Sequence, residues 1–364
     1  MAKGYLISDI HLGVHRLAED KWLKIAKKYF YDFFIPLVQE KWEDGDKIFI
    51  LGDLFDNRSH LSLKVISFAL DLFNDFEKLD LPVLIIGGNH DYYNNNDSEH
   101  TSLRILEKHK NVEIHTEPNL YEFSGKKILL MPWNGVLKEE QEVFRQYAGK
   151  ADYMFSHSEL QGAKTNLKVG LRHGANIADF VAFPKVFSGH IHLHQSIKNF
   201  TYLGSPFHID RNDKGNSKGV TVIDFNAGTE EFIKNDISPE FKTIEISKDS
   251  DIEKLDKLLN IDTSLGVKEN FIDIVINNSV IINSKEARKK IEEISKKKTV
   301  ASIKQIDDIT VKDTIEDVNL DDIGIDVSIE DLLREYVKKQ DFETSSKGKI
   351  LDLLEESIKI SKEE

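Results

Sequence analysis

Short apolar segments that each run into a cluster of Asp, His, Asn or Gly residues constrain this chain more than any other feature. Three such segments and the clusters at their ends are Tyr5–Ser8 with DIH (9–11), Lys47–Leu51 with GD (52–53), and Pro82–Gly87 with GNHD (88–91). Short apolar runs bounded by such residues predict buried strands. Charged side chains at the ends of buried strands are costly to desolvate unless something compensates them. The sequence therefore predicts a sheet whose strand ends carry a polar site.

The chain up to about residue 235 continues this alternation of strands and helices. Amphipathic spacing predicts helices over Trp22–Gln39 and Leu63–Phe76. Further strands are expected at Lys127–Met131, Asp152–Ser156 and Lys185–Ser188. Past Phe200, antiparallel closing strands are expected at Thr201–Leu203, Gly219–Phe225 and Glu231–Lys234. The alternation predicts α/β layers, with the polar clusters at the carboxyl ends of strands, where open sheets place their sites.

The chemistry that fits these clusters is metal binding. Among the 364 residues there is no cysteine, so a metal must be held by His, Asp, Glu, Asn or backbone oxygen. Asp9 and His11 are two residues apart and can grip one ion, and His190 and His192 repeat that spacing. Asp53 has two oxygens with which to bridge two ions. A neutral oxygen and a further imidazole come from Asn89 and His157.

Seven mixed oxygen and nitrogen ligands suit two divalent ions such as Mn²⁺, Fe²⁺ or Zn²⁺ better than a structural zinc. Two ions about 3.5–4 Å apart form the clamp used for displacement at phosphorus. Taken singly, each cluster has an ordinary explanation: a surface loop for DIH, a turn for GNHD, and a packed histidine pair for GHIH (189–192). Their order and their common place at strand ends favour one functional site.

The clusters resemble a known family. SDIHLG (8–13), GDLFDNR (52–58), GGNHD (87–91), SH (156–157) and GHIH (189–192) are similar to the motifs of calcineurin-type metallophosphoesterases. GDLFD and the later YLGSP (202–206) resemble more specifically the SbcD-type nucleases, which are catalytic subunits of double-strand-break repair complexes and include the recombination endonuclease subunit of T4-like phages. The resemblance implies a four-layer α/β fold, a β-sandwich flanked by helices, with a small α/β capping domain and a C-terminal helical pair.

The resemblance also implies roles for single residues. One metal would lie on Asp9, His11, Asp53 and His192, and the second on Asp53, Asn89, His157 and His190. His90 would be the catalytic residue that is not a ligand, with Asp91 orienting it. The expected cofactors are two divalent ions, with Mn²⁺ favoured. Cellular relatives often have a histidine, tied to exonuclease action, where this chain has Asp56, so the balance of exonuclease and endonuclease activity is in question.

The domain organisation expected from the sequence has four parts. A nuclease domain covers 1–238, a capping and DNA-binding domain covers 239–306, an acidic linker covers 307–327, and a helix-loop-helix covers 328–364. In the capping domain, strands at Lys242–Ile246, Phe271–Ile276 and Thr299–Ile306 alternate with helices at Asp251–Leu259 and Ser284–Ser295. Residues 302–331 hold ten acidic residues against two lysines, a net charge of −8 that is typical of a solvated linker.

The two C-terminal helices are amphipathic. Their apolar stripes consist of Ile329, Leu332, Leu333 and Tyr336 on the first helix, and of Ile350, Leu354 and Ile358 on the second. The pattern leaves open whether these stripes pack on the core or bind a partner helix. The family resemblance implies the second alternative, with an SbcC-like coiled-coil ATPase as the partner.

The substrate that the resemblance implies is DNA, although the net charge of −14 argues against general attraction to nucleic acid. Local basic groups are the candidate phosphate contacts: Arg58, Lys164, Lys168, Arg172, Arg211, Lys214 and Lys218. Any one of the lysines alone is better explained as a solvated surface residue, and Arg58 could instead pair with Asp56. The family dimerises through helices after the second and third motifs, so Leu61–Phe76 and Ser98–His109 are the dimer candidates, although the first stripe is also typical of a core helix.

We therefore expect a two-metal DNA nuclease, with double-strand exonuclease and single-strand or hairpin endonuclease activity in repair, recombination and end processing. The alternatives are an esterase for small phosphodiesters or phosphoproteins, and a non-catalytic scaffold for the ATPase. No apolar run approaches the roughly 20 residues of a membrane span. The N-terminal sequence turns polar within nine residues, which is too short for the apolar region of a secretory signal. We expect no membrane association and a cytoplasmic location, in a bacterial host cell if the chain is phage-encoded.

Overall fold

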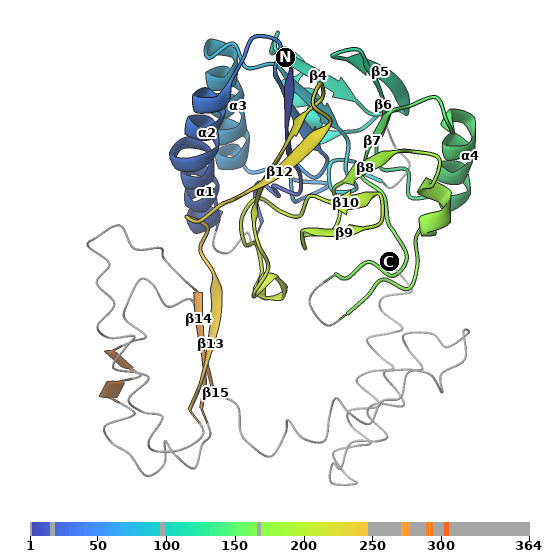
Figure 1. Cartoon of the computed structure of the whole chain (residues 1–364). Helices are drawn as coiled ribbons and strands as arrows, with labels where there is room; N and C mark the ends of the chain where they lie inside the picture. The colour runs from blue at the N-terminus through green and yellow to red at the C-terminus, as the bar shows by residue number, and fades with distance from the viewer. Residues whose placement is uncertain are drawn as a thin grey trace, which may run out of the picture.

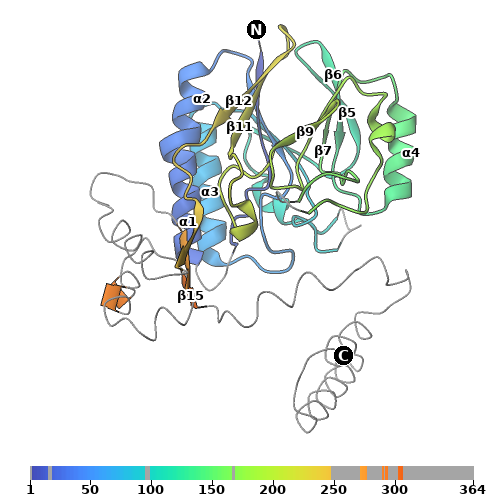
Figure 2. The ribbon, with the colours of Figure 1, turned by 60° about the horizontal axis from the view of Figure 1, so that its bottom comes forward.

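Two six-stranded sheets lie face to face at the centre of the molecule, with helices on their outer faces (Figures 1 and 2). The computed structural model describes residues 2–14, 19–94, 99–165, 169–246, 271–276, 289–290, 292–293 and 302–305. One sheet has the strand order β12-β11-β1-β2-β3-β4, and the other has the order β5-β6-β7-β8-β10-β9. The predicted α/β sandwich flanked by helices is confirmed.

The first sheet is built around three parallel strands from the N-terminal motifs. Its strands are β1 (Lys3–Ile7), β2 (Lys47–Leu51), β3 (Val83–Ile86), β4 (Val112–His115), β11 (Gly219–Asp224) and β12 (Thr229–Lys234). Strands β1 to β4 pair in parallel, whereas β11 pairs antiparallel with both β1 and β12. The carboxyl ends of β1, β2 and β3 therefore lie at one edge of the sheet.

The second sheet repeats this arrangement. Its strands are β5 (Asn119–Phe123), β6 (Lys126–Met131), β7 (Tyr153–Ser156), β8 (Lys185–Ser188), β9 (Gln195–Ile197) and β10 (Phe200–Tyr202). The expectation of an antiparallel strand near Thr201 is right for its pairing with β9, but β10 also pairs in parallel with β8. Strands β4, β5 and β9 are absent from the sequence predictions.

Side chains that alternate along each strand separate the core into layers. Leu6, Phe49 and Leu84 of the first sheet pack with Ile128 and Phe155 of the second in the apolar layer between the sheets. The opposite faces of the first sheet's strands pack against the N-terminal helices, and those of the second sheet pack against α4. Figure 2 shows α1 to α3 along one side and α4 along the other.

Both helices predicted from apolar spacing are present, the first with one interruption, whereas α4 is absent from the sequence predictions. Within residues 2–246 the helices are α1 (Glu19–Lys28), a π-helical segment (Tyr29–Phe34), α2 (Ile35–Lys41), α3 (Leu63–Lys78) and α4 (Leu137–Tyr147). Three short 3₁₀ helices are η3 (Ser102–Leu106), η4 (Ile177–Phe180) and η5 (Arg211–Asp213). A continuous helix was expected over Trp22–Gln39. Its middle part, Tyr29–Phe34, is instead a wider π-helical segment between α1 and α2. Ser62 caps α3 by accepting a hydrogen bond from the Val65 amide at 3.2 Å.

A third, smaller sheet contains β13 (Phe241–Ile246), β14 (Phe271–Ile276) and β15 (Ser302–Gln305), which pair in parallel. All three lie where strands of the capping domain are expected. The ring of Phe241 stacks on Trp22 of α1 at 6.4 Å, which fixes the start of β13 against the larger unit. The helix expected over Asp251–Leu259, most of the one over Ser284–Ser295, and everything from residue 307 onward lie outside the described residues, so the four-part domain division stays a prediction.

Candidate metal centre

The polar clusters of the sequence meet at one place, between the carboxyl ends of strands from both sheets. Asp9 and His11 follow β1, Asp53 follows β2, and residues 89–91 follow β3. His157 follows β7, and His190 and His192 follow β8. A cavity of about 180 Å³ opens among these strand ends. It is lined by His11, Val14, Asp53, Asp56, Asn89, His90, His190, His192, Ile209 and Asp210.

Asp9, His11 and His192 form a first cluster whose ligand atoms lie within 4.8 Å of one another. Nε2 of His11 is 3.1 Å from Nε2 of His192 and 3.6 Å from Oδ2 of Asp53. Two imidazole nitrogens that face each other so closely are a natural pair of ligands, because a cation accepts both lone pairs. The first cluster therefore fits a divalent cation.

A second cluster surrounds the side chain of Asn89. Its Oδ1 lies 3.0 Å from Nε2 of His157 and 2.9 Å from Nδ1 of His190. His157 donates a hydrogen bond from Nδ1 to the Leu51 carbonyl at 2.8 Å, which leaves its Nε2 to face the site. A backbone carbonyl commonly sets the tautomer of a metal-binding histidine in this way.

Asp53 lies between the two clusters. Its Oδ2 is 3.6 Å from Nε2 of His11 and 3.3 Å from Nε2 of His157, so one carboxylate reaches both groups. Burial opposes ionisation of Asp53, but the charge of His157 outweighs it and lowers the pKa of Asp53 well below its ordinary value. A carboxylate ionised at every ordinary pH suits a bridging ligand.

The carboxylates make the site strongly attractive to positive charge. Burial alone would lower the pKa of His11 and of His157. The hydrogen bond of His11 with Asp56 and the charge of Asp53 beside His157 outweigh burial and raise each pKa to about 9. The field that favours imidazolium ions also favours divalent cations, which carry more charge in less volume.

Four of the predicted ligands have left-handed backbone conformations. The φ angles are 53° for Asp9, 49° for His11, 53° for Asp53 and 87° for His190. Among the described residues, only three others outside glycine have positive φ. Such conformations cost about 1–3 kcal/mol each and concentrate at functional sites. The turns after β1, β2 and β8 are thus held in shapes that aim side chains into the cavity.

His90 lies at the same cavity and is fixed by the segment after β2. Its Nδ1 donates to the Asp56 carbonyl at 2.5 Å, and its amide donates to Oδ1 of Asp53 at 2.8 Å. Nε2 of His90 is therefore the nitrogen left for a substrate. His90 also lies close enough to His11 and Asp53 to form a third possible cation cluster.

Asp91 is fully buried and acts on the backbone. Its carboxylate accepts hydrogen bonds from the amides of Asp53 at 2.9 Å, Gly88 at 2.9 Å and Phe55 at 3.1 Å. Burial and the charge of Asp53 raise the pKa of Asp91 to about 7. Asp91 therefore ties the loops after β2 and β3 together and influences His90 through those loops, while the ring of His90 itself meets the Asp56 carbonyl.

Residues 4–194 match the calcineurin-like phosphoesterase family. The chain belongs to that family. The matched segment spans β1 to His192 and includes every predicted ligand. The resemblance of the motifs to metallophosphoesterases is thereby confirmed, and the phosphoesterase domain with its Asp and His clusters supports the use of divalent metal.

Individual relatives are nucleases by name. Exonuclease subunit 1 of Enterobacteria phage T4 is 27% identical over 232 residues, which cover 63% of this chain and 66% of the relative. The SbcD component of the SbcCD nuclease of Staphylococcus epidermidis is 26% identical over 251 residues, which cover 60% of this chain and 64% of the relative. The resemblance to SbcD-type nucleases is confirmed, and the phosphoesterase spans slightly less than two thirds of the length of each relative.

Among solved structures, one whose title describes a novel archaeal phosphodiesterase matches with a TM-score of 0.34 and 13% sequence identity. That match covers 64% of this chain and 99% of the other. A likeness of this size adds nothing to the family assignment.

Glycines allow the strand ends of this phosphoesterase to approach closely. A Cβ on Gly189 would lie 2.0 Å from Oγ of Ser8, 2.3 Å from the Leu51 carbonyl and 2.7 Å from Nδ1 of His157. Ser8 in turn donates a hydrogen bond to the Asp9 carboxylate. A side chain at position 189 would therefore push apart β1, β2 and β7 beside the predicted ligands Asp9 and His157.

We expect Gly189→Ala to lower the free energy of unfolding by about 3 kcal/mol, because the added methyl group has no space among backbone atoms. The matched control is Gly170→Ala, where the added Cβ would meet nothing closer than 3.7 Å; it should stay within about 0.5 kcal/mol of wild type. Urea unfolding of the three proteins measures both values. Equal stability of the Gly189 variant and wild type would contradict the close approach.

The predicted DNA contact at Lys218 is wrong. Lys218 is only 1% exposed. Its ammonium donates to the His192 carbonyl at 2.7 Å and to Oγ of Ser205 at 2.6 Å, and it pairs with Asp213 at 2.5 Å. A lysine enclosed by three oxygens cannot reach a phosphate. Lys218 instead supports the backbone of His192, a predicted ligand.

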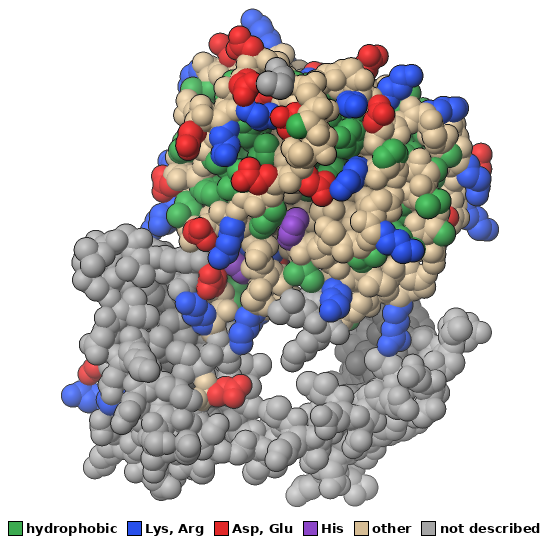
Figure 3. All heavy atoms as spheres, in the orientation of Figure 1, with side chains coloured by type: hydrophobic (Ala, Val, Ile, Leu, Met, Phe, Trp, Pro, Cys, Tyr) green, Lys and Arg blue, Asp and Glu red, His purple; other side chains and the backbone are tan. Residues whose placement is uncertain are grey.

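The other predicted DNA contacts differ in their placement. Lys164, Arg172, Arg211 and Lys214 are exposed, and Lys168 lies outside the described residues. Arg58 is half-buried. It lines a cavity of about 490 Å³ together with the exposed Tyr93 and with Asn57, which is the residue after Asp56. On the face drawn in Figure 3, basic and acidic side chains are interspersed over the described surface. On this face, phosphate contacts would therefore be local.

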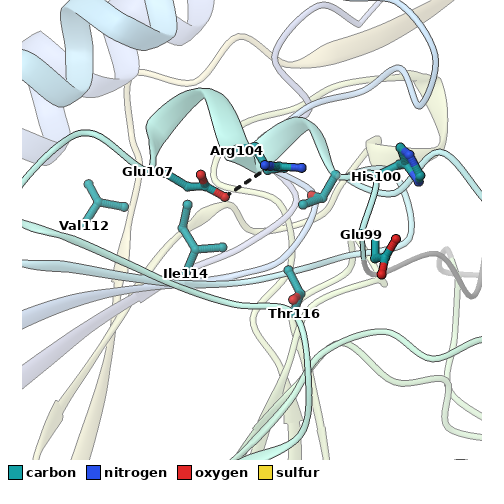
Figure 4. A pocket seen from close by; sticks show the side chains of 8 residues that line it. Glu99, His100, Arg104, Glu107, Val112, Ile114 and Thr116 are labelled. Atoms are coloured by element: carbon teal, nitrogen blue, oxygen red, sulfur yellow. Dashed lines mark ion pairs between the residues drawn. The ribbon is translucent and has the colours of Figure 1, made fainter.

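A neighbouring cavity of about 520 Å³ lies between η3 and β4 (Figure 4). Figure 4 shows Arg104 and Glu107 joined by an ion pair of 3.4 Å on its wall. Leu103 and Leu106 of η3 are fully buried in the core, as is the stripe of α3 that ends at Phe76. Both dimer candidates thus contribute to the core, and dimerisation stays a prediction.

The site also contains residues that the sequence predictions overlooked. Glu159 accepts a hydrogen bond from Nε2 of His190 at 3.0 Å, and the ring of Trp133 stacks on His190 at 5.0 Å with 20° between the planes. Asp56, which the sequence analysis names, has its side chain 3.2 Å from Nδ1 of His11. Proximity to SH (156–157) was the only available signal for Glu159, because its contact with His190 arises only when distant loops meet.

Proposed function

We propose that this chain is a metal-dependent DNA nuclease that uses two divalent cations, with Mn²⁺ favoured. The observation that carries the proposal is the pair of adjoining clusters that share Asp53, with His90 beside them at an open cavity. The names of the phage T4 exonuclease and SbcCD relatives favour DNA as the substrate.

The proposed ligands of one cation are Asp9, His11, Asp53 and His192, and those of the other are Asp53, Asn89, His157 and His190. Bound in this way, two divalent cations would supply Lewis-acid neutralisation of phosphate charge and a water of lowered pKa. The protein holds the ligands ready through the left-handed turns at Asp9, His11 and Asp53, so little reorganisation is needed when the substrate arrives.

His90 is the proposed catalytic side chain. Its Nδ1 proton is committed to the Asp56 carbonyl, which fixes the ring and leaves Nε2 to contact the scissile phosphate. From there a protonated ring donates a hydrogen bond to a phosphate oxygen as charge develops, or a proton to the departing 3′ oxygen. Asp91 keeps His90 in place by accepting hydrogen bonds from the backbone amides of Asp53 and Gly88.

DNA binding would use local cations near the cavity. Arg58 borders the cavity that adjoins Asp56, and Lys164, Arg172, Arg211 and Lys214 are exposed on loops beyond His157 and His192. Lys168 remains a candidate from the sequence. Contacts of this kind position the phosphate backbone without reading base sequence, which suits an enzyme that processes DNA ends of any sequence.

We also propose an SbcC-like coiled-coil ATPase as partner, bound through the C-terminal stripes that contain Leu332 and Leu354, and a homodimer of this chain. The SbcCD name of one relative supports a two-component assembly. The work would take place in the cytoplasm, where DNA is accessible. No helix within the described residues has the length and apolar character needed to cross a membrane.

Both exonuclease activity on duplex ends and endonuclease activity on single strands or hairpins are proposed. Asp56 is the residue to examine for their balance, because its carboxylate contacts the ligand His11 and its carbonyl contacts His90. A histidine at this position would replace the carboxylate beside His11 and alter the support of one cation ligand.

The test uses the full chain and labelled linear duplex, hairpin and single-stranded DNA, with Mn²⁺ or Mg²⁺, with and without the ATPase. We expect cleavage with Mn²⁺ that stops on addition of EDTA and returns when Mn²⁺ is restored in excess. Hydrolysis of bis-p-nitrophenyl phosphate in parallel reports the alternative, an esterase for small phosphodiesters. Turnover of the small ester with no cleavage of any DNA would overturn the nuclease proposal.

A further inference from the structure

The carboxylate of Glu159 lies between two imidazoles, one at the metal centre and one at the surface. Its Oε1 is 3.0 Å from Nε2 of His190, and its Oε2 is 2.7 Å from Nδ1 of His173. Glu159 is about one fifth exposed, whereas His173 is 68% exposed. Glu159 thus reaches the metal centre through His190, whereas its other contact is with an exposed surface histidine.

The contact with Glu159 determines which nitrogen of His190 faces the site. A carboxylate can only accept, so Nε2 of His190 carries the proton and Nδ1 is left with a lone pair in the neutral ring. Nδ1 lies 2.9 Å from Oδ1 of Asn89. Two acceptor atoms converging at this distance form half of the ligand set expected for the second cation.

Other contacts hold the ring of His190 without choosing its tautomer. Trp133 stacks on one face at 5.0 Å, and the backbone amide of His190 donates to the Asp9 carboxylate at 2.9 Å. Stacking fixes the plane of the ring, and the amide fixes the backbone. Of these three contacts, only the hydrogen bond to Glu159 fixes the proton on Nε2 of His190.

Glu159 is itself held firmly. Its carbonyl accepts from the Ala175 amide at 2.8 Å, and the next residue, Leu160, donates its amide to the Tyr202 hydroxyl at 2.8 Å. Gly174 packs so closely that an added Cβ would lie 2.7 Å from the Glu159 carbonyl oxygen. The backbone of the loop after His157 is thus held at Glu159 and Leu160, and the carboxylate already contacts His190 without a cation.

We propose that Glu159 is a positioning residue that holds His190 with Nδ1 toward Asn89 and so sets the cation affinity of the Asn89, His157 and His190 cluster. The inference rests on the proposed two-cation function, but it concerns one site of the two. Partners of this kind, placed behind a ligand histidine, change metal affinity by about 10–100-fold. The Asp9, His11 and His192 cluster makes no such contact with Glu159 in the described structure and should be indifferent to it.

The test is calorimetric titration of the cation-stripped full chain with Mn²⁺ alone. Wild type should bind two ions. Glu159→Ala should weaken one binding event about 10–100-fold and leave the other unchanged, whereas Glu159→Gln, which keeps an acceptor near Nε2, should restore part of that loss. His173→Ala is the matched control, because it removes the other partner of Glu159 and leaves His190 untouched; its two affinities should equal those of wild type.

Unchanged binding by Glu159→Ala, or equal weakening of both events, would overturn the proposal. If Glu159→Ala shows an altered circular dichroism spectrum, Glu159→Gln decides: a smaller weakening of one event alone supports the proposal, and unchanged binding or equal weakening of both events overturns it. DNA cleavage by wild type is judged separately. A chain that binds two Mn²⁺ and loses one in the Glu159 variant, yet cleaves no DNA, would refute the nuclease and leave the role of Glu159 standing.

Discussion

Replacing His90 by alanine is expected to lower the rate of DNA cleavage between about a hundredfold and ten-thousandfold, the range for loss of a positioned acid or base. The ring is fixed by the Asp56 carbonyl and contributes to the cavity wall. Its loss removes the proposed contact with the phosphate while every proposed cation ligand remains. Single-turnover cleavage of labelled DNA with saturating Mn²⁺ measures the effect.

Titration with Mn²⁺ separates two roles for His90, since it lies near enough to His11 and Asp53 to be a ligand. If it acts on the substrate, the His90→Ala variant binds both ions as tightly as wild type. Loss of an ion together with loss of cleavage would make His90 a ligand and contradict the proposed role. The control is His115→Ala, at the end of β4, which should cleave at the wild-type rate.

Asp53→Asn is expected to reduce cleavage by about a thousandfold or more, which corresponds to about 4 kcal/mol of lost transition-state stabilisation. The amide has the shape of the carboxylate and keeps an oxygen to accept from the His90 amide. It lacks the charge that faces both His11 and His157. We therefore expect both Mn²⁺ binding events to weaken together, unlike the effect expected at Glu159.

The matched control for this change is Asp80→Asn, an exposed turn residue whose left-handed conformation asparagine tolerates. It should leave cation binding and cleavage unchanged. If Asp53→Asn weakened only one of the two binding events, Asp53 would belong to one cation, and the proposed bridge between the clusters would be wrong.

Much of the fold was predictable because strand and motif coincide. The strands before DIH, GD and GNHD are short apolar runs that end where a polar cluster begins, and β1, β2 and β3 lie there. Strand β4 (VEIH), strand β5 (NLYEF) and the three-residue β9 (QSI) are half-buried and mix polar with apolar residues. These strands form because neighbouring strands pair with them, and no pattern in their own sequences predicts the pairing.

That the candidate ligands would lie together was predictable for the same reason, whereas the residues that contact them were not. Asp9 and His192 stand in recognisable motifs, but Glu159 and Trp133 reach His190 only after the loops fold together. For Lys218, the sequence predicted an exposed DNA contact, but the side chain is buried. Its position in a loop rich in Gly and Asn favours exposure, yet the pull of Asp213 and two further oxygens draws its ammonium inside. The burial of such a residue depends on charged and polar groups that only the folded chain brings near it.

The pairing of β1 with β11 has a consequence for how the protein is made. Lys3 lies opposite Asp224, so β1 acquires one of its two neighbours only after almost the whole of the double sheet has been synthesised. Contacts so distant in sequence slow folding and leave strand edges exposed in the meantime. Nascent chains that end before β11 should therefore depend on chaperones, and truncation before β11 should yield insoluble fragments.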